Sequence, residues 1–276
     1  MSTSDQTLAA RFFFRNCAVS LHLPGEMRIS RSLTPAPDDV ILDRDFTPAD
    51  FPSEFIGAQS DFYRFLDITS TTNTSIIKKL AAIGYVLCNK IRRDPRYYHA
   101  FMCVNEDKFG SCNGKTLFSK AIAQCCNAVF LHNPNPKNPF WLSDVTEQTN
   151  LLIVDDLSPK TNIRSLYHIC PGDWAIHRKC YSPLIIDREK TPSVIVSVNT
   201  SVDNIRTEAS FRRRFVLLEF SSFFGPENPI DKYFGRIMFL GWDVAQWHMF
   251  DNLMLYCVLE YLRSYDRGID IFRLNR

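Results

Sequence analysis

The stretch Phe109-Gly110-Ser111-Cys112-Asn113-Gly114-Lys115-Thr116 decides the expected fold of this chain. Gly114-Lys115-Thr116 fills the second half of the phosphate-binding pattern GxxxxGK[ST]. In such a loop, small residues allow backbone N–H groups to surround phosphate oxygens, and the following helix directs its positive end toward them. Phe109 occupies the position of the first glycine, and Gly110 comes one place late. A chance Gly-Lys-Thr at the start of a helix is therefore the alternative interpretation.

The candidate nucleotide ligands in this stretch are Gly110, Asn113, Gly114, Lys115 and Thr116. The Lys115 ammonium would reach the β- and γ-phosphates of ATP, and the Thr116 hydroxyl would hold Mg²⁺. The sequence therefore predicts ATP and Mg²⁺ as ligands.

The flanks of the loop have the pattern that the motif requires. Tyr97 to Val104 has the aromatic and β-branched content of a short buried strand. Thr116 to Gln124 suits a helix that buries Leu117, Ile122 and Phe118. The order strand, loop, helix favours the phosphate-loop interpretation.

Two later apolar runs end in polar side chains. Asn150 to Asp156 contains four apolar residues followed by Asp155 and Asp156, and Ser193 to Asn199 ends in an amide. Buried parallel strands read as continuous apolar runs, and ligands bind beyond their carboxyl ends. Asp155 would hold Mg²⁺ through water, Asp156 would orient or deprotonate an attacking water, and Asn199 would position that water or the γ-phosphate. A core strand ending in an acidic turn is the alternative for the first run.

Three adjacent arginines, Arg212 to Arg214, open another predicted apolar strand, within the run Ser210 to Phe220. Such a cluster is usually a solvated edge or a phosphate contact. The place of the cluster after the Asn199 strand suggests that one of the three is an arginine finger.

Helical patterns surround this region. Phe62, Phe65 and Leu66 mark one helix face between Ala58 and Arg93, and a second helix there carries several Ile and Leu residues, capped by Asn73 or Thr74. Asp243 to Tyr265 predicts a long amphipathic helix. Residues 1–55 contain one strand pattern, Cys17 to Leu23, a Pro24-Gly25 turn and a proline-rich connector, and they predict no chemistry.

The composition narrows the class of protein. The chain has 276 residues, a net charge of +2 and a hydrophobic fraction of 45%. Nucleic-acid binding therefore cannot be argued from global charge and needs a local basic feature. No apolar run is long enough to cross a bilayer, so no membrane association is expected.

Nine scattered cysteines and the absence of a signal-peptide pattern indicate free thiols and a cytoplasmic location. His168, Cys170, His177 and Cys180 leave a zinc site open, although their spacing matches no standard pattern.

Taken together, the loop, the acidic pair, Asn199 and the arginines resemble the superfamily 3 helicases, particularly the phage, plasmid and poxvirus-type primase-helicases. The compact order of the motifs, the Asn-Gly-Lys-Thr form of the loop and the Asp-Asp ending carry this resemblance, which spans roughly residues 62–276. It implies Lys115 and Thr116 as the Walker A pair, Asp155 and Asp156 as Walker B, and Asn199 as sensor 1. It also implies Arg214 as the arginine finger, with Arg213 as the second candidate.

The resemblance also implies a β-hairpin between Walker B and sensor 1, where the family contacts the nucleic-acid backbone. The matching stretch is Gly172 to Pro183, with His177, Arg178 and Lys179 as candidate phosphate contacts. A solvated basic loop is the alternative.

The expected fold is an α/β P-loop NTPase core of the AAA+-like superfamily 3 type, with a parallel sheet. The expected domains are a mixed N-terminal region (1–55), a helical collar (56–94), the core (95–225) and a C-terminal helical segment (226–276). The resemblance implies an ATP-driven helicase of phage or mobile-element replication that forms a hexameric ring on single-stranded nucleic acid, with DNA favoured. A primase or other replication proteins are candidate partners. An NTPase switch and a nucleotide-binding scaffold without hydrolysis are the alternative functions.

Overall fold

The computed structural model describes residues 8–32, 34–35, 39–49, 60–88, 100–107, 112–170, 172–201 and 208–273. The chain divides into two compact units. The terminal unit comprises Met1–Lys90, Cys112–Gly114 and Phe223–Arg276, and the central unit comprises Ile91–Ser111 and Lys115–Ser222. No helix in the described ranges has the length and hydropathy of a membrane span.

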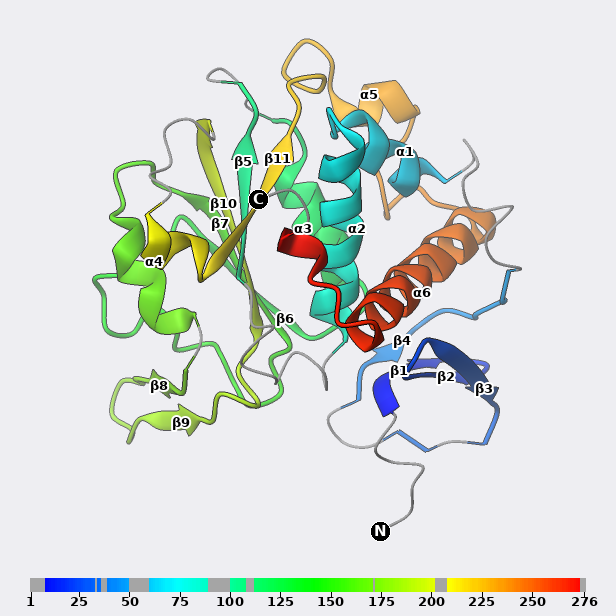
Figure 1. Ribbon diagram of the computed structural model, residues 1–276, viewed down its shortest axis with the longest axis horizontal. Helices are drawn as coiled ribbons and strands as arrows, with labels where there is room; N and C mark the ends of the chain where they lie inside the picture. Colours follow the sequence, from blue (N-terminus) through cyan, green and yellow to red (C-terminus); the bar gives the residue numbers. More distant parts are fainter. Residues whose placement is uncertain are drawn as a thin grey trace. The chain divides into compact units, whose positions relative to one another are not determined.

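The central unit contains a five-stranded sheet in the order β11-β5-β10-β7-β6, in which every neighbouring pair is parallel (Figure 1). Its strands are β5 (Ala100–Asn105), β6 (Ala128–His132), β7 (Leu151–Leu157), β10 (Ser193–Ser201) and β11 (Phe215–Phe220). The predicted parallel sheet is thus confirmed, since every neighbouring pair of its strands is parallel. Each predicted apolar run forms a strand of this sheet. The first three residues of the run predicted as β5 lie outside the described residues.

The strand order brings the predicted motifs to one edge of the sheet. After β5, the chain runs to the far strand β6 and returns through β7 to β10, which lies between β7 and β5. The next strand, β11, lies on the other side of β5. Ligands in open α/β sheets bind beyond the carboxyl ends of the strands where the order reverses. Here, that point lies between β5 and β10.

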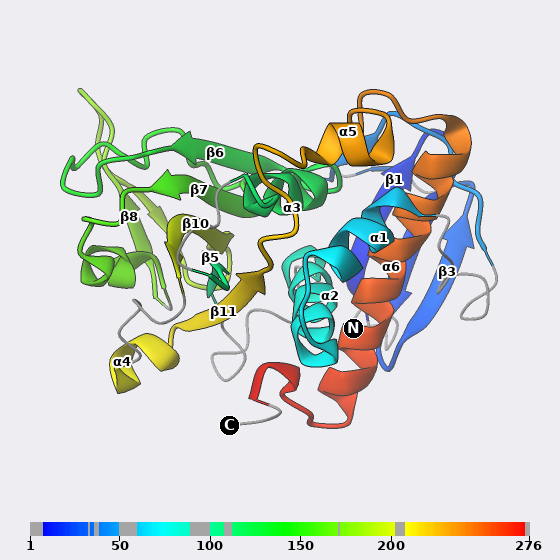
Figure 2. The ribbon, with the colours of Figure 1, turned by 90° about the horizontal axis from the view of Figure 1, so that it is seen from above.

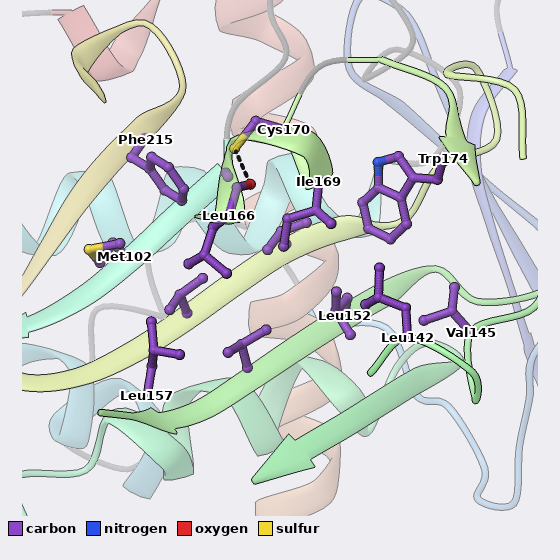
Figure 3. Close-up of a cluster of buried hydrophobic side chains, with 14 of the residues drawn as sticks. Met102, Leu142, Val145, Leu152, Leu157, Leu166, Ile169, Cys170, Trp174 and Phe215 are labelled. Carbon is purple, nitrogen blue, oxygen red and sulfur yellow. Dashed lines mark hydrogen bonds between the residues drawn. The ribbon is translucent and has the colours of Figure 1, made fainter. Parts of the chain in front are cut away.

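The two faces of this sheet are covered by different elements (Figure 2). On one face lies α3 (Lys115–Ala123), whose Phe118 contacts Phe220 of β11 edge to face at 5.8 Å. On the other face, Met102, Leu152 and neighbouring strand residues pack with Leu166, Trp174 and Phe215 in one buried cluster (Figure 3). This cover consists of η3 (Ile163–Ile169), β8 (Trp174–Ile176), β9 (Leu184–Ile186) and α4 (Ala209–Arg212).

The segment before β11 differs from the sequence prediction. The arginines do not open the strand: Arg212 ends the short helix α4, and β11 begins at Phe215. Phe211 and Phe215 stack at 5.0 Å and are both buried. Phe211 and Phe215 are four residues apart, so a helical turn between them brings both rings to the same side. The packing of the two rings therefore stabilises this turn.

The terminal unit combines a small sheet with helices. The sheet has the order β3-β2-β1-β4 and contains β1 (Leu8–Phe14), β2 (Ala18–His22), β3 (Glu26–Ser30) and β4 (Ile41–Leu42). The helices are α1 (Asp61–Ile68), α2 (Asn73–Leu87), α5 (Ile230–Phe234), α6 (Val244–Asp266) and the 3-10 turn η5 (Ile271–Arg273). The predicted strand at Cys17 to Leu23 and the long C-terminal helix are confirmed.

The predicted cap of α2 is wrong by one or two residues. Thr72, rather than Asn73 or Thr74, has an extended backbone, and its hydroxyl accepts a hydrogen bond from the Ser75 N–H at 3.1 Å. A cap must lie outside the helix while its side chain turns back to the first turn, and Thr72 satisfies both conditions.

The helices α2 and α6 approach closely at Gly84. A Cβ atom at this position would lie 2.1 Å from the Cys257 carbonyl oxygen, so only glycine allows the two backbones to meet.

In the same unit, the buried Asp251 carboxylate pairs with the Arg44 guanidinium, with a shortest distance of 2.6 Å. Burial raises the pKa of Asp251, and the Arg44 charge opposes that shift.

Candidate nucleotide site

A bulge in β7 directs the acidic pair. Val154 lies opposite Val196 of β10, whereas Leu157 lies opposite Val198, so β7 contains one residue more than its partner in this interval. Asp156 lies in the bulge and has a φ of 52°, a left-handed conformation that is uncommon for a residue other than glycine. Bulges bend a strand and change the direction of its side chains. Asp156 therefore leaves the regular alternation near the end of the strand, whereas Asp155 still pairs in register with His132 of β6.

Asp155 is the centre of the hydrogen-bond network. Its carboxylate is buried, with 5% of the residue exposed. Asp155 Oδ1 accepts hydrogen bonds from the Thr116 hydroxyl at 2.8 Å and from the Ser197 hydroxyl at 2.6 Å. Its Oδ2 lies 3.5 Å from Nδ1 of His132, the last residue of β6. The structure thus brings together the predicted metal ligands Thr116 and Asp155.

The second carboxylate, that of Asp156, contacts the predicted sensor residue. The Asn199 side-chain amide donates to Asp156 Oδ1 at 2.6 Å. Asn199 is exposed, and Asp156 is half-buried. This pair therefore lies where solvent water has access to the carboxylate, as a water-orienting role requires.

Lys115 begins α3 and is buried, with 6% of the residue exposed. Its ammonium donates to the side-chain oxygen of Asn105, the last residue of β5. A buried charge without a partner is costly, so the amide oxygen stabilises the lysine. Because Lys115 and Thr116 are the first residues of α3, the backbone N–H groups that have no acceptor within the helix lie at this point.

The rest of the predicted loop divides between described and undescribed residues. Gly110, together with Phe109, lies outside the described residues. Asn113 is buried, and Gly114 has a φ of +93°, in the region that favours glycine. A Cβ atom at Gly114 would lie 2.4 Å from the Phe65 ring, so the position requires glycine on two grounds.

A hairpin is present at the predicted place, although its second strand, β9, begins at Leu184, just beyond the predicted stretch Gly172 to Pro183. β8 and β9 pair in antiparallel fashion, and Trp174 and Ile186 pack into the buried cluster from its base. At the tip, His177 and Lys179 are exposed. Arg178 is half-buried, and its guanidinium donates to the Val145 carbonyl at 2.9 Å. The three candidate contacts are therefore not equally available to a ligand.

The candidate finger arginines also differ in exposure. Arg213 is exposed, whereas Arg214 is half-buried. The Arg214 guanidinium lies 4.7 Å from the centre of the Tyr167 ring and donates to the Ser210 carbonyl at 2.9 Å. Arg214 therefore makes contacts within its own unit.

The His/Cys segment does not assemble as a metal site. In the part of the chain that the structure describes, no three His, Cys, Asp or Glu side chains gather in a way that could hold a metal ion. Burial raises the pKa of Cys170 to about 12, although the nearby Arg214 charge opposes this shift. Cys170 therefore remains a thiol at neutral pH.

Three residues of the network escaped the sequence analysis: Asn105, His132 and Ser197. Asn105 and His132 are each the last residue of a strand of the sheet, and this position was the available signal. Ser197 was marked by being a polar residue within the apolar run of β10. Their partners depend on strand order, which the sequence alone did not supply.

Known structures resemble this chain at low sequence identity. The A-form apo structure of the NrS-1 C-terminal region matches with a TM-score of 0.45 and 11% identity, covering 99% of this chain and 69% of that chain. A JCV helicase bound to a small molecule matches with a TM-score of 0.38 and 12% identity, covering 76% of this chain and 67% of that chain. No protein-family model and no curated protein matches the sequence.

Both similarities extend over most of this chain. At identities of 11% and 12%, this similarity assigns no activity or partner to the chain.

Proposed function

We propose that this chain is a P-loop ATPase of the superfamily 3 helicase type that moves along single-stranded nucleic acid, in the replication of a phage or mobile element. The observation that carries the proposal is the contact between Thr116, at the start of α3, and Asp155, near the end of β7. These residues lie far apart in sequence, and their meeting is what a phosphate loop and an acidic strand end require.

The oxygen donors at this point fit Mg²⁺. A hydroxyl and a carboxylate are hard ligands, and Mg²⁺ is held in nucleotide sites by one or two such side chains together with substrate phosphates. Thr116 and Asp155 would hold the ion. Once bound, Mg²⁺ neutralises charge that develops on the phosphate oxygens.

The remaining side chains support in-line attack of water on the γ-phosphate. Lys115 exchanges its contact with Asn105 for the β- and γ-phosphates. Asp156, oriented by the Asn199 amide, positions the attacking water and accepts its proton. Arg214, or Arg213, stabilises transition-state charge at the site of a neighbouring subunit in a hexameric ring.

The hairpin of β8 and β9 supplies the contact with nucleic acid in this proposal. Exposed His177 and Lys179 at its tip suit phosphate oxygens of a single strand. Residues 56–94 serve as the collar and 95–225 as the motor core, and 226–276 complete the chain as a helical segment.

The decisive experiment measures ATP turnover by the full chain with and without single-stranded DNA. We expect ATP hydrolysis that DNA stimulates, and its loss in Lys115→Ala because the charge between the β- and γ-phosphates is removed. Lys120→Ala is the matched control, since Lys120 is an exposed lysine on the same helix.

Each of the other outcomes would favour a different function for the chain. Turnover that DNA leaves unchanged would favour an NTPase switch, and nucleotide binding without turnover would favour a scaffold. Wild-type turnover by Lys115→Ala would show that the loop assignment is wrong.

A further inference from the structure

Ser197 belongs to the hydrogen-bond network around Asp155 without being one of the expected site residues. It lies on β10, the strand between the phosphate-loop strand β5 and the acidic strand β7. The residue is buried, with 2% exposed. Its side chain therefore contacts the site from within the sheet, on an element held on both sides by parallel partners.

The Ser197 hydroxyl contacts both acidic residues. It donates its proton to Asp155 Oδ1 at 2.6 Å and accepts a hydrogen bond from the Asp156 backbone N–H at 3.0 Å. A hydroxyl has one proton and two lone pairs, so it can make both bonds at once. One atom thus orients the Asp155 carboxylate and fixes the backbone of Asp156.

Both contacts meet a physical need of the bulge. The left-handed conformation of Asp156 is unfavourable and persists only where its surroundings fix it. A bulge also interrupts the regular ladder, which leaves the extra residue without its usual strand partner. The Ser197 hydroxyl supplies a partner for that N–H, and so it stabilises the conformation that presents the Asp156 carboxylate to Asn199.

We propose that Ser197 is a positioning residue for ATP hydrolysis: it holds Asp155 and Asp156 in the geometry that the reaction requires. The inference rests on the proposed function. When Thr116 turns its oxygen to a metal ion, Ser197 remains the hydroxyl donor that orients Asp155 Oδ1. Ser197 contacts no substrate, and it acts only through the two aspartates.

The test compares Ser197→Ala, Ser197→Thr and Ser193→Ala in the full chain. Ser193 is the matched control, because it is a buried serine and the first residue of the same strand. We expect Ser197→Ala to lower kcat by about 10- to 100-fold, the range for losing a hydrogen bond to a charged group. ATP affinity should change by less than about threefold, because Lys115 and the loop are untouched. Ser197→Thr keeps the hydroxyl and should restore most of the turnover, and Ser193→Ala should turn over normally.

A second readout does not depend on ATP. Amide hydrogen exchange of Asp156 should be slow in the wild-type chain and in Ser197→Thr, and faster in Ser197→Ala, because the N–H loses its acceptor. This measurement keeps the two proposals apart. A wild-type chain that hydrolyses no ATP would overturn the proposed function, while unchanged exchange at Asp156 would overturn the inference about Ser197.

Two kinetic results would also overturn the inference. One is wild-type kcat in Ser197→Ala. The other is an equal loss of kcat in Ser197→Ala and Ser193→Ala, which would indicate a general loss of strand packing.

Discussion

At the scale of single residues, Thr116 has one hydroxyl and two successive partners. In the structure it donates to Asp155 Oδ1 at 2.8 Å, and in the proposed reaction its oxygen holds Mg²⁺. We therefore predict that Thr116→Ala raises the Mg²⁺ concentration needed for half-maximal ATPase activity by about tenfold or more, the scale of one lost interaction with a charged group.

The readout is a Mg²⁺ titration of ATP turnover at saturating nucleotide. Thr116→Ser keeps the hydroxyl and should stay near the wild-type value, whereas Asp155→Ala should remove the Mg²⁺ dependence of nucleotide binding. Identical titrations for the wild type and Thr116→Ala would separate Thr116 from the metal.

At the scale of elements, the hairpin of β8 and β9 presents three basic candidates in two different situations. Lys179 is exposed at the tip, whereas the Arg178 guanidinium is bound to the Val145 carbonyl at 2.9 Å. The log of the affinity for a single strand falls with the log of salt concentration by about 0.7 for each phosphate contact. We predict that Lys179→Ala weakens single-stranded DNA binding and reduces this slope by about 0.7.

Arg178→Ala should change the slope less than Lys179→Ala, and the double variant should reduce it by no more than about 1.4. Lys190→Ala is the control, since Lys190 is exposed but lies beyond the hairpin. The test measures single-stranded DNA binding by each variant across a salt series, with basal ATP turnover measured in parallel. Equal slopes for all variants would make the tip a solvated basic loop.

The elements also show how far sequence patterns reach. The apolar runs that end at Asp156 and Asn199 predicted β7 and β10, because continuous apolar residues mark strands buried on both faces. The same patterns missed α4, since a single helical turn has no periodicity and is set here by the stacking of Phe211 on Phe215. They also missed the role of Ser197, which depends on β10 lying beside β7 and on a bulge that no local pattern encodes.

At the scale of the whole molecule, the proposed ring makes each ATP site depend on two copies of the chain. Arg214 would enter the site of a neighbour, where its guanidinium stabilises charge that appears only in the transition state. In the structure, this side chain rests on Tyr167 and donates to the Ser210 carbonyl, so acting in a neighbour's site requires it to exchange those contacts. Arg213, the residue before Arg214, is exposed, so it is the second candidate to enter the neighbour's site.

We predict that Arg214→Ala lowers turnover by about a thousandfold or more and leaves ATP affinity unchanged, because the lost contact exists only in the transition state. Mixing two inactive variants tests whether Arg214 acts in the ATP site of a neighbouring subunit. Arg214→Ala subunits keep an intact loop, and Lys115→Ala subunits keep an intact arginine, so a mixed ring should regain ATP turnover at boundaries that combine the two. The same mixture made with Arg213→Ala shows which arginine enters the neighbouring site, and Arg188→Ala, at an exposed arginine outside this segment, should turn over normally. Subunits that assemble together yet remain inactive would exclude Arg214 from the neighbour's site, and normal turnover by Arg214→Ala would exclude it from the reaction.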